Sequence, residues 1–300
     1  MEYFLDLFNE RKEFIETFFE DAVFPDFKKN FHSILAEASI YSLRAGGKRL
    51  RPVLTISAYL SSRPNISENV LNAAAALECI HTYSLIHDDL PAMDDDDYRR
   101  GVLTCHKKFS ESTAILAGDA LNSYGFYLIS QLKTNDSELL IDILKLLHEG
   151  AGGFGMVSGQ MEDLQLENNP NLFNEKTLDS IHNKKTGALI VASLLIGNRL
   201  TEDWQIKENP FRIYGNKIGL LFQITDDIID EEGSFEELGK TPGKDIASGK
   251  LTYPSLYGMQ KTKKLRDEIK EELISLSKNL ESSDSHFFKN LPVYIAERKK

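Results

Sequence analysis

Cysteine is scarce in this chain of 300 residues, which contains only Cys79 and Cys105. Two cysteines are too few for a disulfide framework, so a reducing compartment is the simpler assumption. The N-terminus, MEYFLDLFNERKEF, lacks both a basic-then-apolar signal pattern and an Arg/Ser-rich transit pattern. Long apolar runs are also missing, because GALIVASLLIG at 187–197 is far shorter than the roughly 20 residues that span a bilayer. These absences predict a soluble, cytoplasmic protein.

Positive charge is in deficit, with 35 Lys and Arg against 46 Asp and Glu and a net charge of −11. This balance argues against nucleic acid as a partner, because a polyphosphate backbone requires an extended basic face. It does not exclude a small phosphorylated ligand, which a few local cations or bridging metal ions can hold. The share of hydrophobic residues, 41%, is that of a globular protein able to bury a sizeable core.

Strand-like alternation is hard to find, whereas apolar residues at spacings of three and four recur along the chain. Ser67 and Thr201 are expected helix starts, because both residue types cap helix N-termini. The periodic segments are 3–20, 27–45, 66–88, 112–132, 137–164, 176–198, 211–230 and 262–281. Breaks are expected at the turn-forming stretches 61–67, 133–137, 167–171, 207–210 and 239–245. No linker or repeat divides the chain, so the predicted fold class is all-α, a single-domain helical bundle over residues 1–300.

The stretch HDDLPAMDDDDYRRG at 87–101 concentrates aspartates and then two arginines. An acidic run is most often a solvated loop. Here, however, Asp88 and Asp89 end a largely apolar helix that Pro91 breaks. Clustered carboxylates repel one another and lose charge unless a cation compensates them, and oxygen-rich sites of this kind suit Mg²⁺. The run therefore predicts a metal site at the mouth of a core helix.

A similar cluster recurs far along the chain as FQITDDIID at 222–230. On a helix Asp226 and Asp230 share a face, with Asp227 beside them, and the neighbouring isoleucines suggest a buried element. Mg²⁺ is usually bound by one or two carboxylates together with phosphate oxygens. Two such clusters on facing helices would hold several divalent ions and a bridging diphosphate or triphosphate.

Cationic residues accompany both clusters, in GGKRLRP at 46–52, in Arg99 and Arg100, in KKT at 184–186 and in Lys240. Each is weak evidence alone. Together with the carboxylates they predict sites for phosphoanions, some bound through metal and some directly by Arg and Lys.

The chain resembles the trans-isoprenyl diphosphate synthases over roughly residues 40–260. The resemblance is carried, in the family's order, by GGKRLRP, DDLPAMD (88–94), LAGDAL, GQMEDL, HNKKTGAL, DDIID (226–230) and GKLTYP. Within that family the chain is most similar to the bacterial-type farnesyl diphosphate synthases, which carry two extra residues inside the first aspartate motif.

The resemblance implies a helical bundle around a central cavity, with the two aspartate motifs on facing walls, and a homodimer. It implies three Mg²⁺, with Mn²⁺ as an alternative, held by Asp88, Asp89, Asp94, Asp226, Asp227 and Asp230. Residues matching the site for isopentenyl diphosphate are Lys48, Arg51, His81 and Arg100. Residues matching the site for the allylic diphosphate are Arg99, Lys185, Thr186, Gln223 and Lys240.

The implied reaction is a prenyl transfer. Metal, Arg99, Lys185 and Lys240 would stabilise the leaving diphosphate as the allylic C–O bond ionises. Thr186 and Gln223 would place an oxygen near the allylic cation. Isopentenyl diphosphate then attacks, and the proton passes to the departing pyrophosphate, so no side-chain nucleophile or general base is required.

Product length is expected to depend on Ile80, Tyr83 and Ser84, which precede Asp88 on the same predicted helix. In the family, bulk at these positions ends elongation. Tyr83 is large and Ser84 small, so Tyr83 is the expected floor and a fifteen-carbon product, farnesyl diphosphate, the expected product. A twenty-carbon product from the same chemistry is the alternative.

Two functions of other classes remain open. A terpene cyclase would not require the second phosphate site of GGKRLRP, His81 and Arg100, and a non-catalytic partner subunit commonly loses aspartate motifs that are kept here. Other motifs receive structural interpretations: helix packing for GAGGFGMVSGQ at 150–160, and structural or solvated roles for His87, His106 and His182. The basic stretch ERKK at 297–300 is interpreted as a solvated tail, with the alternative that it closes over the site, as the terminus does in some relatives. One departure from the family is Val102-Leu103 after RRG, where many relatives carry Lys-Pro.

Overall fold

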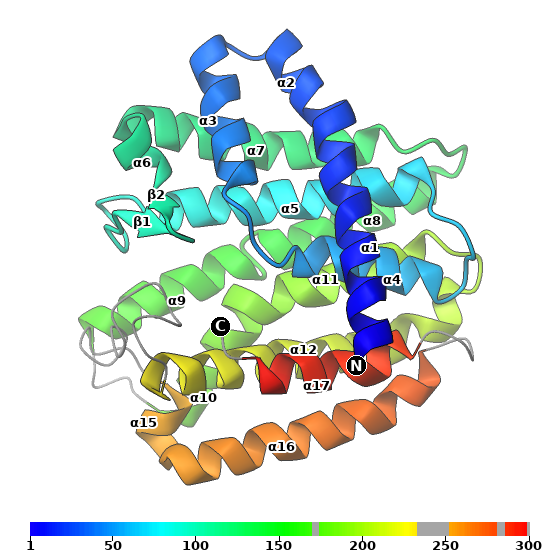
Figure 1. The fold of residues 1–300 in the computed structure, drawn as a ribbon, viewed down its shortest axis with the longest axis vertical. Coiled ribbons are helices and arrows are strands. Elements are labelled where there is room, and N and C mark those ends of the chain that lie inside the picture. The colour runs from blue at the N-terminus through cyan, green and yellow to red at the C-terminus, as the bar shows by residue number, and fades with distance from the viewer. Residues whose placement is uncertain (170–173, 233–251, 281–285, 299–300) are drawn as a thin grey trace. The chain divides into compact units, whose positions relative to one another are not determined.

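The computed structural model describes residues 1–169, 174–232, 252–280 and 286–298. These residues are almost entirely helical (Figure 1), which confirms the all-α prediction. They form two compact units, an N-terminal unit of residues 8–144 and a C-terminal unit of residues 1–7 with 145–300. The single domain over residues 1–300 stays a prediction. Within the described residues, no helix combines the length and the apolar character needed to cross a membrane.

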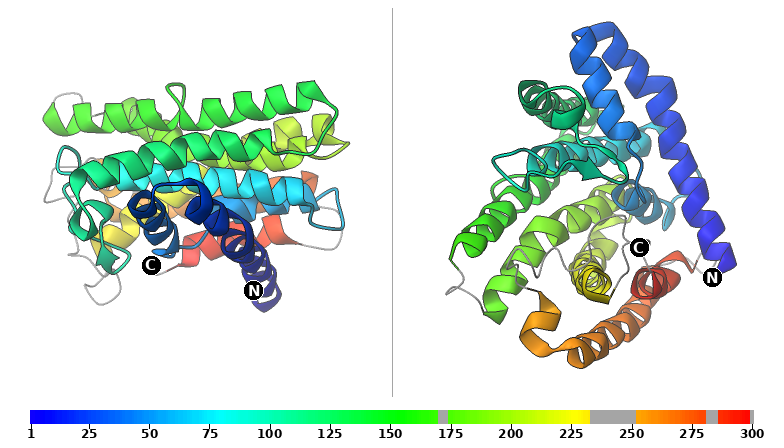
Figure 2. Two further views of the ribbon diagram at one scale, coloured as in Figure 1. Left: turned by 90° about the horizontal axis from the view of Figure 1, so that it is seen from above. Right: turned by 60° about the vertical axis from the view of Figure 1, so that its left-hand side comes forward.

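The N-terminal unit is organised around α5, which packs along α7 and α4 (Figures 1 and 2). Alanines 73–76 of α5 are completely buried, and these small side chains let neighbouring helices approach closely. Ser67 caps α5 as predicted, because its hydroxyl accepts a hydrogen bond from the Val70 amide. The elements are η1 (Phe19–Val23), α2 (Phe24–Asn30), α3 (Ser33–Arg44), α4 (Leu50–Leu60), α5 (Glu68–Asp88), β1 (Tyr98–Arg99), β2 (Val102–Leu103), α6 (Cys105–Lys108) and α7 (Glu111–Ser130).

Two helices, α1 (Glu2–Phe18) and α8 (Ser137–Ala151), contribute residues to both units. The remaining elements belong to the C-terminal unit. In that unit α12 contacts α11, α16 and the π-helix η3, and α16 also packs on α17. Its elements are α9 (Met156–Asn168), α10 (Glu175–Ile181), η3 (His182–Gly187), α11 (Ala188–Arg199), α12 (Trp204–Glu232), α15 (Tyr253–Tyr257), α16 (Met259–Leu276), the 3₁₀ turn η4 (Ser277–Asn279) and α17 (Phe287–Glu297).

Several predicted boundaries are wrong. The segment 27–45 is interrupted because Phe31 is extended. The segment 137–164 divides into α8 and α9 at residues 152–155, three of which are glycines. The break expected at 207–210 does not occur, since α12 runs through Pro210. Thr201 does not cap α12, because that helix begins only at Trp204. The Thr201 hydroxyl instead donates to the carbonyl of Asn198.

Within the described residues, the structure contains four helices, α4, α6, α15 and α17, that the periodicity did not indicate. Nearly every residue of α4 is buried, so its sequence LRPVLTISAYL lacks a polar face. In α17, Pro292 lies inside the helix, and because proline disfavours a helix interior the sequence does not indicate a helix there. The residues Val102 and Leu103, which depart from the family pattern, form strand β2 of a short antiparallel hairpin.

Candidate functional site

The first aspartate motif lies where α5 ends. Asp88 is the last helical residue and Asp89 the C-cap, and the Asp94 amide donates to the Asp88 carbonyl at 2.9 Å. This turn folds the chain back immediately after the helix, so Asp94 returns toward Asp88. Asp89 is only 3% exposed, which makes it a buried carboxylate rather than a member of a solvated loop.

Arg99, on strand β1, compensates the charge of Asp89. Its Nε atom lies 2.7 Å from Oδ1 and 2.9 Å from Oδ2 of the carboxylate. Burial raises the pKa of Asp89, and Arg99 opposes that rise. Burial alone would lower the pKa of Arg99, but the hydrogen bond and charge of Asp89 raise it above its ordinary value. The two-stranded hairpin therefore holds a cation beside the motif.

The later aspartates of the run have a different environment. Lys107 contacts Asp97 at 2.7 Å and Asp95 at 3.9 Å, and both carboxylates are largely exposed. The hydrogen bond from Lys107 lowers the pKa of Asp97. Asp95 and Asp97 are therefore part of a solvated loop. Asp88, Asp89 and Asp94 instead belong to the folded turn at the end of α5.

A group of cations gathers around the loop between α3 and α4. Arg100 has a positive φ of 53° and donates a hydrogen bond to the Gly46 carbonyl. Its guanidinium lies where a side chain on Gly47 would be, since a Cβ there would be 2.5 Å from Nη1. Gly47 is therefore required for this close approach, and Arg100 is held over the start of GGKRLRP. Lys48 lies in the same loop and is half-buried.

Arg51 and His81 complete this cationic group. Burial, opposed by Glu78 and reinforced by Arg100, lowers the pKa of Arg51 to about 10. The buried Nε of Arg51 has no hydrogen-bond partner among the described residues. Burial and the charges of neighbouring arginines, Arg51 first, bring the pKa of His81 well below its usual value. Crowded cations of this kind are electrostatically suited to an anion.

Arg49, in the middle of the same motif, has a structural role that the sequence did not indicate. It is 3% exposed and contacts Glu78 at 2.7 Å and Glu16 at 2.8 Å. Its Nη2 also donates to the Leu43 carbonyl. In GGKRLRP, the charge of Arg49 is therefore neutralised by two glutamates. Arg51, by contrast, keeps a hydrogen-bond donor, its Nε, without a partner among the described residues.

The three residues assigned to product length lie on one side of α5. Ile80 is fully buried, and a side chain on Gly125 of α7 would collide with it. Tyr83 is 8% exposed, and its ring meets that of His87 edge to face. Burial, with the charge of Asp88, raises the pKa of Tyr83. The Ser84 hydroxyl donates to the His81 carbonyl, so Ser84 adds no bulk.

The second aspartate motif lies on α12 in the C-terminal unit. Asp230 is 6% exposed, whereas Asp226 and Asp227 are half-buried. The Asp227 carboxylate accepts a hydrogen bond of 2.8 Å from the Tyr253 amide at the start of α15. The hydroxyl of Tyr253 in turn donates to Asp179. The GKLTYP motif therefore supplies a residue that orients the second aspartate motif.

Lys185 and Thr186 lie on the π-helix η3, beside α9. A side chain on Gly159 of α9 would overlap the backbone of Lys185, so this glycine permits the contact. One turn further, Asp163 accepts a hydrogen bond of 2.6 Å from Lys185 Nζ. This confirms the packing interpretation of the glycine-rich segment at Gly159. Burial lowers the pKa of the neighbouring His182 to about 4, as expected for a buried histidine.

Gln223 lies on α12, one turn after Gly219, whose lack of a side chain allows close contact with Gly187 of η3. Lys240, assigned to the allylic site, lies outside the described residues.

The interpretation of ERKK as a solvated tail is wrong for Arg298. The side chain of Arg298 is 5% exposed and forms an ion pair with Asp226. Lys299 and Lys300 lie outside the described residues.

Metal binding was tested against the donors that the structure provides. Among the described residues, no three His, Cys, Asp or Glu side chains form a group that could hold an ion. The aspartates nevertheless supply the carboxylate oxygens that Mg²⁺ prefers, and Mg²⁺ needs only one or two of them beside phosphate oxygens and water. The donor set therefore fits a metal that binds together with a phosphorylated ligand.

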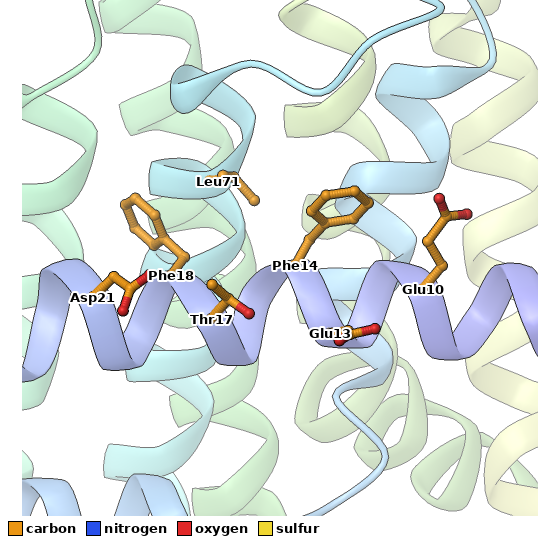
Figure 3. Close-up of a pocket in the computed structure, with 7 residues that line it drawn as sticks. All are labelled: Glu10, Glu13, Phe14, Thr17, Phe18, Asp21 and Leu71. Carbon is orange, nitrogen blue, oxygen red and sulfur yellow. The ribbon is translucent and has the colours of Figure 1, made fainter.

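A groove of about 350 Å³ on the N-terminal unit lies elsewhere, between α1 and Leu71 of α5 (Figure 3). Its described lining includes Glu10, Glu13 and Asp21 and no lysine or arginine. No residue assigned to the candidate site lines it. A much smaller cavity under the hairpin is lined by Asp89, Arg99 and Arg100 among others.

Comparison with known proteins identifies the class. The polyprenyl synthetase family model matches residues 32–288, and the chain belongs to that family. It is 47% identical over 268 residues to the farnesyl diphosphate synthase of Micrococcus luteus, covering 89% of this chain and 90% of that protein. It is 40% identical over 266 residues to the chloroplastic geranylgeranyl pyrophosphate synthase of Capsicum annuum, covering 88% and 72%.

Solved structures agree with this result. The geranyltransferase of Helicobacter pylori, complexed with magnesium and isoprenyl diphosphate, matches with a TM-score of 0.76 and 32% identity. The match covers 94% of this chain and 95% of that one. The resemblance seen in the motifs is confirmed, and with it the isoprenoid synthase type of fold.

Proposed function

We propose that this protein is a farnesyl diphosphate synthase, which condenses isopentenyl diphosphate with dimethylallyl and geranyl diphosphate. The observation that carries the proposal is the pair of cations Arg51 and Arg100, with the uncharged His81 beside them, present in addition to two aspartate motifs. A terpene cyclase ionises one diphosphate and needs no second anion site. The farnesyl diphosphate synthase of Micrococcus luteus, at 47% identity, supports the proposal.

Isopentenyl diphosphate would bind at the cationic group. Arg51 offers its unused Nε donor, and Arg100 and Lys48 add positive charge around the glycine loop. His81, uncharged at neutral pH because of its lowered pKa, would donate or accept a hydrogen bond rather than add charge. Binding a dianionic group here would relieve repulsion among the cations.

The allylic diphosphate would bind through metal held by Asp88, Asp89 and Asp94 and by Asp226, Asp227 and Asp230. We propose Mg²⁺, which would neutralise the diphosphate and stabilise the charge that develops on it. Arg99 and Lys185, together with Lys240, would contact the diphosphate oxygens directly. Both Arg99 and Lys185 are held by aspartates before substrate binds, so their positions are already fixed.

The chain's own residues would then protect the cation formed when the C–O bond breaks. Thr186 and Gln223 would direct oxygen atoms toward the positive carbon, where the double bond of isopentenyl diphosphate attacks. The proton lost from the new bond would pass to the released pyrophosphate. This assignment requires no side-chain base.

Tyr83 is proposed as the floor that stops elongation at fifteen carbons. The alternative, a geranylgeranyl diphosphate synthase, has support in the 40% identity to the enzyme of Capsicum annuum. Tyr83 is large, almost buried and fixed against His87, which favours the shorter product.

The proposal is tested by product chromatography after incubation with Mg²⁺, labelled isopentenyl diphosphate and geranyl diphosphate. Wild-type protein should give a fifteen-carbon product, and Tyr83→Ala should shift most of the product to twenty carbons or more. Ser84→Ala, which removes only a hydroxyl, serves as the control and should keep the wild-type product. A twenty-carbon product from wild type, or an unchanged product from Tyr83→Ala, would contradict the assignment of the floor.

A homodimer and a cytoplasmic location complete the proposal. Both come from family resemblance and from the sequence, and light scattering and cell fractionation would test them.

A further inference from the structure

Arg298 has a buried side chain although it lies outside the helices. It directly follows α17 and has an extended backbone, yet its side chain is only 5% exposed. An arginine side chain is normally hydrated at its guanidinium group, because the charge favours water. Its burial therefore requires specific contacts.

Among the described residues, the Arg298 side chain contacts Phe222 and Asp226 of α12, at the second aspartate motif. The Nη2 atom donates to Oδ1 of Asp226 and, at 3.1 Å, to the carbonyl of Phe222. The guanidinium carbon lies 3.9 Å from the centre of the Phe222 ring, a stacked cation–π arrangement. Because Phe222 and Asp226 are one helical turn apart, a single planar guanidinium reaches both.

The charge balance explains the contact. Asp226, Asp227 and Asp230 place three carboxylates on one stretch of α12, and their mutual repulsion favours a cation beside them. Arg298 supplies that cation at Asp226. The carboxylate itself is 44% exposed, so it remains reachable from solvent.

We propose that Arg298 is the resident counter-ion of Asp226, a positioning residue that leaves the carboxylate when the second aspartate motif takes up a divalent ion. This inference rests on the metal role proposed above for Asp226. A guanidinium and a divalent ion at one carboxylate would repel each other at a separation of about 4 Å. Only the residue after α17 has to move, so the exchange leaves the helices intact.

The consequence is that Arg298 lowers the affinity of the second aspartate motif for metal. The experiment is an equilibrium dialysis of the full-length protein against Mn²⁺ in the presence of a fixed concentration of inorganic pyrophosphate, because the donor set fits a metal that binds together with a phosphorylated ligand. The amount of protein-bound Mn²⁺ is the readout. Arg298→Ala should bind Mn²⁺ about fivefold more tightly than wild type. Arg298→Lys, which keeps the charge but not the planar stacking, should fall between them.

Two further variants separate the possible failures. Lys263→Ala removes another cation paired to α12, at Glu232, and should bind Mn²⁺ as wild type does. In an Asp226→Asn background, Arg298→Ala should have no effect. If Asp226→Asn weakens Mn²⁺ binding but Arg298→Ala leaves it at the wild-type value, the counter-ion role is overturned alone. If Asp226→Asn itself has no effect, the proposed metal role of Asp226 fails and the inference fails with it.

A second measurement detects the movement directly. Trypsin cleaves after arginine, and the buried side chain of Arg298 should make that bond a slow substrate. With inorganic pyrophosphate present, Mn²⁺ should accelerate cleavage after Arg298 in wild-type protein, as read by mass spectrometry. In Asp226→Asn the cleavage should be rapid without metal and insensitive to it. Equal rates in wild type with and without Mn²⁺ would overturn the proposal.

Discussion

Replacing Asp89 with asparagine is expected to lower kcat by roughly 10²–10³-fold, the range found when one charge-stabilising group is lost from an active site. Asparagine keeps the volume of the side chain but removes the negative charge. It would leave Arg99, now bound at 2.7 Å and 2.9 Å to the carboxylate, without its ionic partner. The variant would therefore lose a proposed metal ligand, and Arg99 would lose the ion pair that positions it before metal binds.

The matched control is Asp97→Asn, in the same acidic run. Asp97 is largely exposed and pairs with Lys107, so its replacement should change kcat by less than about twofold. Steady-state assays with labelled isopentenyl diphosphate, and melting temperatures for both variants, provide the comparison. Wild-type turnover in Asp89→Asn would remove the first aspartate motif from the mechanism.

Replacing Arg51 with glutamine is expected to raise KM for isopentenyl diphosphate by about 10- to 100-fold, because hydrogen bonds to charged groups contribute about 1.5–3 kcal/mol. Arg51 is a half-buried cation whose pKa is lowered to about 10 and whose buried Nε has no partner among the described residues. Because the Arg51 Nε has no hydrogen-bond partner among the described residues, replacing Arg51 should shift the melting temperature by only a few degrees.

Arg49 provides the opposite case two residues earlier. Its ion pair with Glu78 is buried on both sides, and removing one partner of such a pair costs about 3–5 kcal/mol of the free energy of unfolding. Arg49→Gln should therefore lower the melting temperature strongly. Kinetic and unfolding measurements on the two variants decide the assignment. The assignment of Arg51 to substrate binding is wrong if Arg51→Gln destabilises the protein without raising KM. The assignment of Arg49 to stability is wrong if Arg49→Gln raises KM without lowering the melting temperature.

The helices that carry the two aspartate motifs were predictable from sequence. Both α5 and α12 combine long apolar periodicity with carboxylates at one end, and the Ser67 cap marked the start of α5. The helix α4 was not predictable in this way, because it is buried on nearly all sides and its Val53, Thr55 and Ile56 have strand propensity. Pro210 and Pro292 lie inside α12 and α17, although proline disfavours a helix interior. Here the tertiary packing of the helix overrides the local propensity of the proline.

Within the candidate site, residue types were predictable but pairings were not. GGKRLRP showed two arginines, and nothing local distinguishes Arg49, which binds Glu16 and Glu78, from Arg51. These partners come from distant segments, so only the folded chain assigns them. Likewise ERKK looked like a solvated tail, and the contact of Arg298 with Asp226, 72 residues away in sequence, has no local signal.

The central claim, that this protein joins two diphosphate substrates, is tested most directly by pyrophosphate release from geranyl diphosphate in the presence of Mg²⁺. The account predicts that release requires isopentenyl diphosphate and that an equal amount of fifteen-carbon product forms. Release at the same rate without isopentenyl diphosphate would indicate a cyclase, and no release under either condition would indicate a non-catalytic subunit. Either of these results would contradict the account.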